Sequence, residues 1–159
     1  LSETMSPMQF SRLINRFYTG AARVIGDQDG LLEKLAGDSV AAFWGAGFAG
    51  PDYVRRTIET GQHLLHVMAQ EQIPIGVGVN AGVAYFGAVG TEEGLTEFAA
   101  LGDEVNLAAR LAGQAAAGEI IVSQAALSAA GLPADGLETR DLTLKGISRP
   151  VVAYVLREA

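Results

Sequence analysis

The sequence predicts an α/β sandwich that forms one domain over residues 1–159. Apolar residues recur at helical spacing in the segments 7–21 and 51–72, whereas shorter apolar runs bounded by turn residues have the pattern of strands. The chain has 159 residues, of which 49% are apolar and 18% charged, so it can bury a sizeable core. It contains no internal repeat and no low-complexity linker. We therefore expect a single domain in which helices and strands alternate.

The first predicted element is a helix that begins at Pro7. Ser6 and Gln9 have the spacing of a capping box, and Pro7 takes the first helical position, where proline is favoured. Apolar residues then follow at helical period: Phe10, Leu13, Ile14, Phe17 and Ala21. The segment 26–30 is rich in glycine and aspartate, which indicates the end of this helix.

A hairpin and a second helix are predicted next. Two apolar runs, 31–36 and 39–44, are separated by Gly37 and Asp38, which predicts a β-hairpin with an aspartate at its tip. An amphipathic helix that starts at a proline is predicted over 51–72. Its buried side is expected to consist of Val54, Ile58, Leu64, Leu65 and Met68.

The segment 75–81 is predicted to be a central strand with two different faces. Its bulkier apolar residues alternate with Gly76, Gly78 and Asn80, so one face packs normally while the other lets a backbone or a ligand approach closely. We expect 82–89 to pair with this strand. The other predicted elements are a strand at 96–101, a helix opening at 102–103, a strand at 119–122, a helix capped by Ser123, and strands near 137–144 and 151–156.

Charge and composition exclude several classes of partner. The net charge of −7 argues against a surface that wraps nucleic acid, although a few cations in a cleft can still hold a compact triphosphate. The chain has no cysteine, so it forms neither disulfides nor thiolate metal sites, which suits a cytoplasmic protein or domain. The uncharged stretch 73–90 has nearly the length of a membrane span, but its proline and five glycines indicate buried strands. No signal peptide is visible, and we expect membrane contact only through upstream segments.

Two metal-site patterns are incomplete. His63 and His66 are three residues apart on a predicted helix, but no third ligand stands at a zinc-like spacing, so we interpret them as a solvated face. Asp27 and Asp29 begin like a calcium loop and then lack its remaining ligands. Neither pattern predicts a metal site.

Three segments place polar side chains beside apolar runs: 33–38, 101–111 and 144–146. Asn106 and Arg110 are four residues apart, which puts an amide and a guanidinium on one helix face where both can reach one ligand. The alternative for that pair is a solvated arginine beside a helix asparagine. Lys34 and Lys145 are the only lysines in the chain, and each lies in one of these segments.

Taken together, these segments resemble the class III adenylate and guanylate cyclases. The family's motifs occur here in the same order, and the likeness covers nearly all of residues 1–158. They stand as Lys34-x-x-Gly37-Asp38, Gly102-Asp103-x-Val105-Asn106-x-Ala108-Ala109-Arg110 and Lys145-Gly146. The resemblance implies a ferredoxin-like βαββαβ core with a C-terminal α/β extension and a mostly antiparallel sheet. It also implies an enzyme that converts ATP into 3′,5′-cyclic AMP and pyrophosphate in intracellular signalling.

The resemblance assigns roles to individual residues. Asp38 is similar to one of the two carboxylates that hold two Mg²⁺ or Mn²⁺ ions per site, since these metals prefer hard oxygen ligands. The ions would lower the pKa of the ribose 3′-hydroxyl for in-line attack on the α-phosphorus. Arg110 is similar to the donor that stabilises charge on the α-phosphate, and Asn106 to the group that orients the ribose.

The two lysines also match family positions. Lys145 is similar to the lysine that contacts the terminal phosphates, and Lys34 to the base-reading lysine. In this family the metal-binding carboxylates come from one subunit, whereas the base-reading lysine and the Asn/Arg pair come from the other. The resemblance therefore implies a homodimer that binds ATP, or alternatively GTP. Without the family pattern, Asp38 would be an ordinary turn aspartate and both lysines would be solvated charges.

The sequence departs from the family in two places. The family's first strand, with a second metal-binding aspartate, should lie just before the helix at Pro7, and this sequence begins after it. Either the strand exists in the full protein, or the domain has lost catalysis. Ala99 stands where adenylate cyclases of this family usually carry Asp or Thr to accept a hydrogen bond from the adenine amino group. Loss of this hydrogen bond should weaken discrimination between adenine and guanine by about 1 kcal/mol. By the resemblance, Lys34 still favours ATP.

Three hypotheses follow from these observations. The first is an active, metal-dependent adenylate cyclase domain of a signalling protein, and a variant of it has a relaxed preference between ATP and GTP. The second is a catalytically degenerate cyclase-homology domain that serves dimerisation or nucleotide sensing. The third is an unrelated ferredoxin-like binding domain. Asn106 and Arg110 favour the first, because a purely structural module has little need of both.

Overall fold

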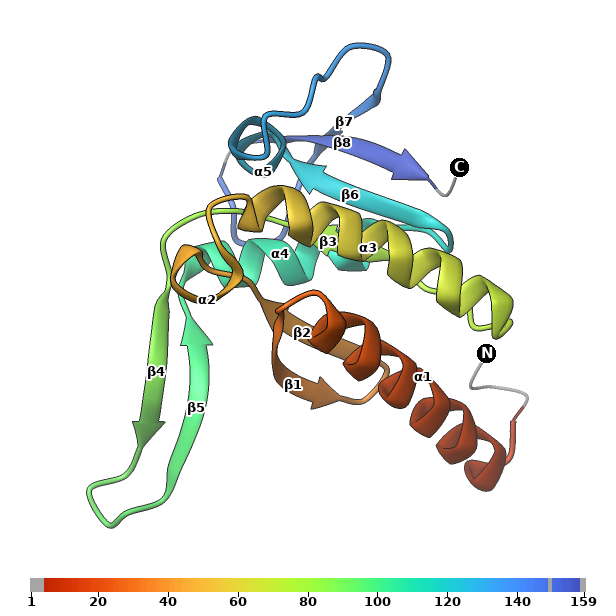
Figure 1. The fold of residues 1–159 in the computed structure, drawn as a ribbon, viewed down its shortest axis with the longest axis vertical. Helices are drawn as coiled ribbons and strands as arrows, with labels where there is room; N and C mark the ends of the chain where they lie inside the picture. Colours follow the sequence, from red (N-terminus) through yellow and green to blue (C-terminus); the bar gives the residue numbers. More distant parts are fainter. Residues whose placement is uncertain (1–4, 149, 158–159) are drawn as a thin grey trace.

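The computed structural model describes residues 5–148 and 150–157, and their first element is a helix (Figure 1). The strand expected before Pro7 lies outside the described residues. The helices are α1 (Pro7–Asp27), α2 (Ala46–Ala49), α3 (Tyr53–Gln70), α4 (Asp103–Gln114) and α5 (Gln124–Ala129). The strands are β1 (Leu31–Ala36), β2 (Ser39–Phe43), β3 (Val77–Val79), β4 (Tyr85–Gly90), β5 (Thr96–Leu101), β6 (Glu119–Ser123), β7 (Glu138–Leu142) and β8 (Val151–Arg157).

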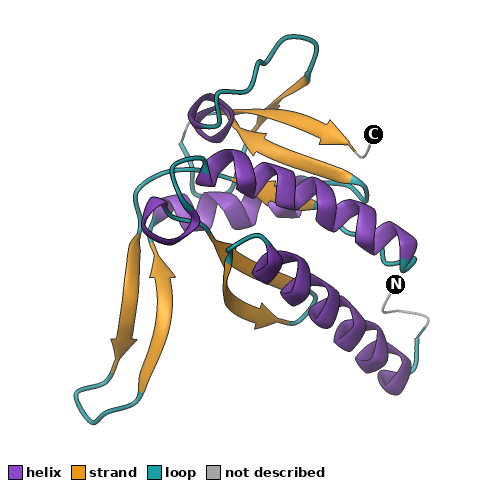
Figure 2. Ribbon diagram, viewed as in Figure 1, coloured by secondary structure: helices purple, strands orange, loops and turns teal. Residues whose placement is uncertain are grey.

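The main sheet has four strands in the order β3-β6-β8-β7. The β3–β6 pair is parallel and the other two pairs are antiparallel, and two separate antiparallel hairpins, β1–β2 and β4–β5, complete the strands. The secondary-structure view in Figure 2 shows the β4–β5 hairpin projecting away from the helices and the main sheet. The prediction of a mixed, mostly antiparallel α/β fold is confirmed.

Two predictions about strand pairing were wrong. The strand predicted at 75–81 is not central, because β3 lies at the edge of the main sheet and pairs only with β6 among the described residues. The segment 82–89 does not pair with it. Instead β4 pairs with β5 across a short turn closed by the bond from the Thr91 amide to the Leu95 carbonyl. A hairpin between neighbours in the chain needs only this local closure.

The central strand β6 is buried on both faces, and each face meets different helices. Ile120, Ile121 and Val122 have no exposed surface. Ile120 and Val122 pack with side chains of α3 and α5, whereas Ile121 packs with Leu111 of α4 on the other face. A further core joins α1 to α3 and to the β1–β2 hairpin. The sheet is therefore covered by α3 and α5 on one side and by α4 on the other.

The helix boundaries follow from the capping residues. The Ser6–Gln9 capping box is formed, with both reciprocal hydrogen bonds present, and Ser123 caps α5 as predicted. Helix α3 was predicted over 51–72 but spans Tyr53–Gln70, and the short α2 was not predicted. Gly50, with φ of 79°, ends α2, so the proline after it stands between two helices. No described helix combines the length and hydropathy that crossing a membrane requires.

Candidate active site

Helix α4 lies directly on the glycine face of β3. A Cβ atom placed on Gly78 would lie 2.5 Å from the Ala108 carbonyl oxygen, and one on Gly76 would lie 2.6 Å from the Ala115 carbonyl oxygen. No side chain fits between the two backbones at these points. The alternation of small residues in 75–81 therefore serves the close approach of a backbone, and that backbone belongs to the helix that carries Asn106 and Arg110.

Arg110 is half-buried on α4 and touches a turn that is distant in the sequence. Gly146 has φ of 80°, and a Cβ atom placed on it would lie 3.2 Å from Nη1 and 3.3 Å from Nη2 of Arg110. The Lys145-Gly146 turn thus packs against the guanidinium. This contact brings together two of the three polar segments found in the sequence, 101–111 and 144–146. Lys145 itself is exposed.

The guanidinium of Arg110 has an unused donor. Its Nη1 atom is buried, and no described residue accepts a hydrogen bond from it. A buried donor without a partner costs about 1–3 kcal/mol of folding free energy. An oxyanion ligand, such as a phosphate oxygen, would satisfy this atom. Asn106 lies one turn earlier on the same face of α4 and is exposed.

Asp38 stands at the tip of the β1–β2 hairpin, as predicted, and its side chain is exposed. The turn is held from two sides, because the Tyr18 hydroxyl of α1 donates to the Gly37 carbonyl at 2.6 Å and the Ser39 hydroxyl donates to the Ala36 carbonyl at 2.9 Å. Gly37 has φ of 60°, a left-handed conformation that favours glycine. The carboxylate is thus presented to solvent from a fixed turn.

The donor chemistry at Asp38 fits a single oxygen ligand to a divalent cation. Within residues 5–148 and 150–157, no three His, Cys, Asp or Glu side chains gather as a metal site. Mg²⁺ is commonly held by one or two carboxylates together with substrate phosphates and water. The carboxylate of Asp38 suits such an arrangement as one oxygen ligand.

Lys34 and Ala99 lie on the two hairpins. Lys34 is exposed on β1 opposite Ala41, and Ala99 is half-buried on β5 opposite Gly87, with β1 and β5 in contact. No side chain among Lys34, Asp38, Asn106, Arg110 and Lys145 forms a hydrogen bond or ion pair with another described residue. The single chain therefore brings Arg110 and the Lys145 turn together but does not join them to the hairpin residues.

Sequence reasoning missed one cluster of charged side chains. Glu119 at the start of β6 is only 6% exposed and accepts hydrogen bonds from Arg140 at 2.8 and 2.9 Å and from Arg157 at 2.9 Å. Hydrogen bonds from Arg140 and from the Ala116 amide lower the pKa of Glu119 to about 2. Glu119, Arg157 and Arg140 come from three strands that lie side by side in the sheet, β6, β8 and β7. They are far apart in the sequence, so no local motif predicts this cluster.

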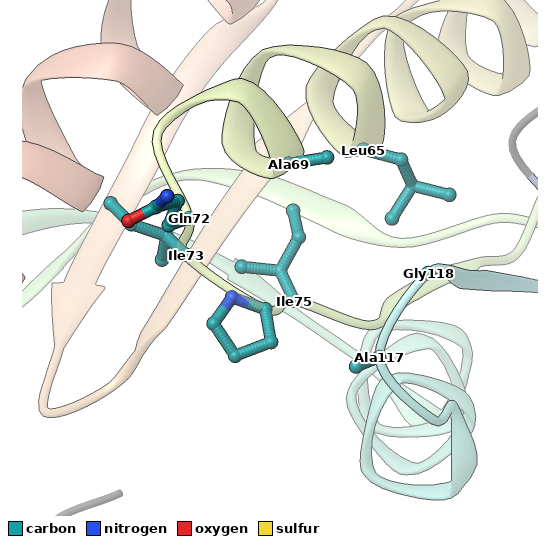
Figure 3. A pocket seen from close by; sticks show the side chains of 8 residues that line it. Leu65, Ala69, Gln72, Ile73, Ile75, Ala117 and Gly118 are labelled. Carbon is teal, nitrogen blue, oxygen red and sulfur yellow. The ribbon is translucent and has the colours of Figure 1, made fainter.

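The hollow shown in Figure 3 does not belong to this site. It is apolar, lies between the end of α3 and the segment entering β3, and is lined by Leu65, Ala69, Gln72, Ile73, Pro74, Ile75, Ala117 and Gly118. None of the polar motif residues lines it. His63 and His66 are exposed on α3, as predicted.

Comparisons with known proteins show what this chain is similar to. The model of the family "Adenylate and Guanylate cyclase catalytic domain" matches residues 1–158. Adenylate cyclase 1 of Rhizobium meliloti is 28% identical over 123 residues, which are 71% of this chain and 18% of that protein. An uncharacterized protein of Mycobacterium tuberculosis is 32% identical over 159 residues, 99% of this chain and 38% of that protein. The chain thus spans well under half the length of these relatives.

A solved structure shows the same fold. The crystal structure of the guanylyl cyclase Cya2 superposes with a TM-score of 0.83 and 26% identity, covering 97% of this chain and 83% of that one. The family match extends over nearly the whole sequence, and the fold agrees with that of a solved cyclase. The chain therefore belongs to the family of adenylate and guanylate cyclase catalytic domains.

Proposed function

We propose that this chain cyclises a nucleoside triphosphate, with ATP as the first candidate, to a 3′,5′-cyclic monophosphate and pyrophosphate. The observation that carries the proposal is the arrangement at Arg110. Its guanidinium has a buried donor without an acceptor among the described residues and lies against Gly146, the residue that follows Lys145 in the chain. A triphosphate offers the oxygen acceptors that this region lacks.

The chain's own residues supply binding, orientation and charge stabilisation. In the reaction the ribose 3′-oxygen forms a bond to the α-phosphorus, and the bond from the α-phosphorus to the oxygen that bridges it to the β-phosphorus breaks. Pyrophosphate leaves with that oxygen, and the 3′-hydroxyl proton passes to solvent water. Arg110 donates hydrogen bonds to the α-phosphate oxygens as their charge develops. Lys145 neutralises the departing phosphates, and Asn106 holds the ribose so that its 3′-oxygen is in line.

Asp38 is the residue proposed to hold the metal. Two Mg²⁺ or Mn²⁺ ions per site would activate the attacking hydroxyl and offset the charge of the triphosphate. A carboxylate on a fixed hairpin turn can present one hard oxygen ligand without rearrangement. By the resemblance, the second carboxylate ligand is expected on a strand before Pro7, which lies outside the described residues.

A homodimer is the assembly that we propose. By the family pattern, Asp38 of one copy would meet Lys34, Asn106 and Arg110 of the other, and among the described residues of one copy the Arg110 Nη1 donor has no acceptor. Both hairpins expose large apolar side chains, which indicates an interaction surface. They are Leu31, Leu32 and Leu35 of β1 and Tyr85, Phe86, Val89, Phe98 and Leu101 of β4 and β5.

Base preference follows from Lys34 and Ala99. Lys34 favours adenine by the resemblance described above, whereas the methyl side chain of Ala99 accepts no hydrogen bond. We therefore propose ATP as substrate with weak discrimination against GTP. The second candidate is a nucleotide-binding or dimerising domain without turnover, and it is favoured by the finding that no three His, Cys, Asp or Glu side chains gather as a metal site among the described residues.

The test is formation of cyclic nucleotide from ATP and from GTP, with Mg²⁺ and with Mn²⁺, by this chain and by the full protein that its gene encodes. We expect Arg110→Ala to lower kcat by about 10²–10³-fold with a smaller change in KM, since its donors act mainly in the transition state. Arg23→Ala is the matched control, because Arg23 is an exposed arginine on α1. Equal turnover in the two variants would refute the role of Arg110. A folded, dimeric wild-type protein without product would favour the second candidate.

A further inference from the structure

The contact between β3 and α4 ends in a group of hydrogen-bonded polar residues, Asn80, Glu104 and Ser123, which we call the polar clamp. Gly76 and Gly78 meet the backbone of α4 without side chains. The next residue on the same face of the strand is Asn80, and it alone offers hydrogen-bonding groups to the helix. Its Nδ2 atom donates to the Glu104 carbonyl at 3.0 Å and to the Glu104 carboxylate Oε2 at 2.6 Å.

Asn80 is itself oriented by a second residue. The Ser123 hydroxyl donates to Asn80 Oδ1 at 2.6 Å and accepts from the Ala126 amide at 3.1 Å as the N-cap of α5. This bond fixes which end of the Asn80 amide faces Glu104, so the NH₂ group points to α4. The clamp thus connects β3, the start of α4 and the end of β6.

The surroundings of Glu104 are shaped for this contact. A Cβ atom placed on Gly82 would lie 2.5 Å from Cγ and 2.7 Å from Cδ of Glu104. The Glu104 side chain therefore folds over the backbone of Gly82, in space that only a glycine leaves open. Glu104 and Asn80 are both half-buried, which strengthens hydrogen bonds between them.

The clamp sets the position of α4 along its own axis. Contacts between bare backbones and glycines are weakly directional, whereas the two bonds from Asn80 specify one residue of the helix. A shift of the helix by one residue would move Asn106 and Arg110 by about 1.5 Å along the axis. A misplacement of about 1 Å can lower a rate roughly 10²-fold.

We infer that Asn80 is a positioning residue for the reaction: with Ser123 and Glu104 it fixes the register of α4 on β3 and so places Asn106 and Arg110. The inference rests on the proposed function, because it assigns a purpose to the placement of those two side chains. Asn80 touches neither of them and acts through the helix.

The first test compares Asn80→Ala with Tyr154→Phe. Tyr154→Phe removes the hydroxyl's bond to Gln124, a partly buried hydrogen bond of similar kind, without touching α4. We expect Asn80→Ala to lower kcat about 10–100-fold with KM changed less than threefold, and to speed amide hydrogen exchange across 103–114. Tyr154→Phe should leave both unchanged. Equal kcat values and equal α4 exchange in the two variants would overturn the inference.

The second test reverses the donor and the acceptor. Asn80→Asp faces the Glu104 carboxylate with a like charge, and we expect it to be less active than Asn80→Ala. Adding Glu104→Gln places an amide donor opposite the new carboxylate, so the double variant should recover at least about tenfold in kcat over Asn80→Asp. A double variant no more active than Asn80→Asp would contradict the pairing. If the wild-type protein forms no cyclic nucleotide, the proposed function fails, and the exchange rates of α4 still decide whether Asn80 holds the helix.

Discussion

Replacing Gly146 by alanine should have two effects: it should strain the backbone of the turn, which lowers stability, and it should displace the Arg110 side chain, which lowers kcat. The substitution forces alanine into a left-handed conformation, which costs about 1–2 kcal/mol. It also places a methyl group 3.2–3.3 Å from two guanidinium nitrogens, closer than a comfortable contact. The side chain of Arg110 must therefore move by a few tenths of an ångström. Because about 1 Å costs roughly 10²-fold in rate, we expect kcat to fall about threefold to fivefold.

Gly136 provides the matched control for this experiment. It has the same φ of 80°, and a methyl group there would meet nothing within 4 Å. Thermal unfolding should show similar losses of stability for Gly146→Ala and Gly136→Ala, whereas cyclic-nucleotide formation should fall only in the former. The reasoning is refuted if the two variants lose the same fraction of kcat, or if Gly146→Ala keeps wild-type kcat while it is destabilised.

Two further predictions concern stability and metal use. The lowered pKa of Glu119 stabilises the fold above pH 4.5, and this stabilisation should be lost as the pH falls from 4.5 toward 2. Its size is about 2 kcal/mol, less than the full shift would give because Arg157 stays half exposed. Between pH 4.5 and 2, the free energy of unfolding of Glu119→Gln, measured with urea, should change less with pH than that of the wild type. An equal change in the two proteins would contradict the lowered pKa of Glu119. Tyr18→Phe removes the hydroxyl's bond to the Gly37 carbonyl and loosens the turn that carries Asp38. A Mn²⁺ titration of activity should need about threefold to fivefold more metal for half-maximal rate, with kcat at saturation unchanged; an unchanged midpoint would count against a metal role for this hairpin.

Local signals in the sequence predicted the elements well. The spacing of Ser6 and Gln9 predicts the start of α1, and Gly37 predicts the tight turn, because caps and turns depend on neighbours within a few residues. The small-residue face of 75–81 also predicted a close approach by a backbone or a ligand, and the structure shows the backbone of α4 there. Pairing between strands depends on the whole fold, and for that reason the edge position of β3 and the partner of β4 were not found.

The candidate site was predicted residue by residue but not as an arrangement. The motif positions of Lys34, Asp38, Asn106, Arg110 and Lys145 came from the sequence, and their roles stay predictions. The packing of Gly146 on Arg110 and the bonds of Asn80 join segments that no spacing rule connects. These contacts are seen only in the folded chain.

The projecting β4–β5 hairpin offers a way to observe the proposed dimerisation directly. Its Phe86 ring lies 5.6 Å from the Phe43 ring of β2 between centroids, whereas the contact of 4.6 Å between Phe86 and Phe98 is internal to the hairpin. Two strands alone are only marginally stable in water, so the hairpin gains stability when another surface covers its apolar side chains. Hydrogen exchange along 85–101, followed as protein concentration rises, therefore measures association without substrate, metal or turnover.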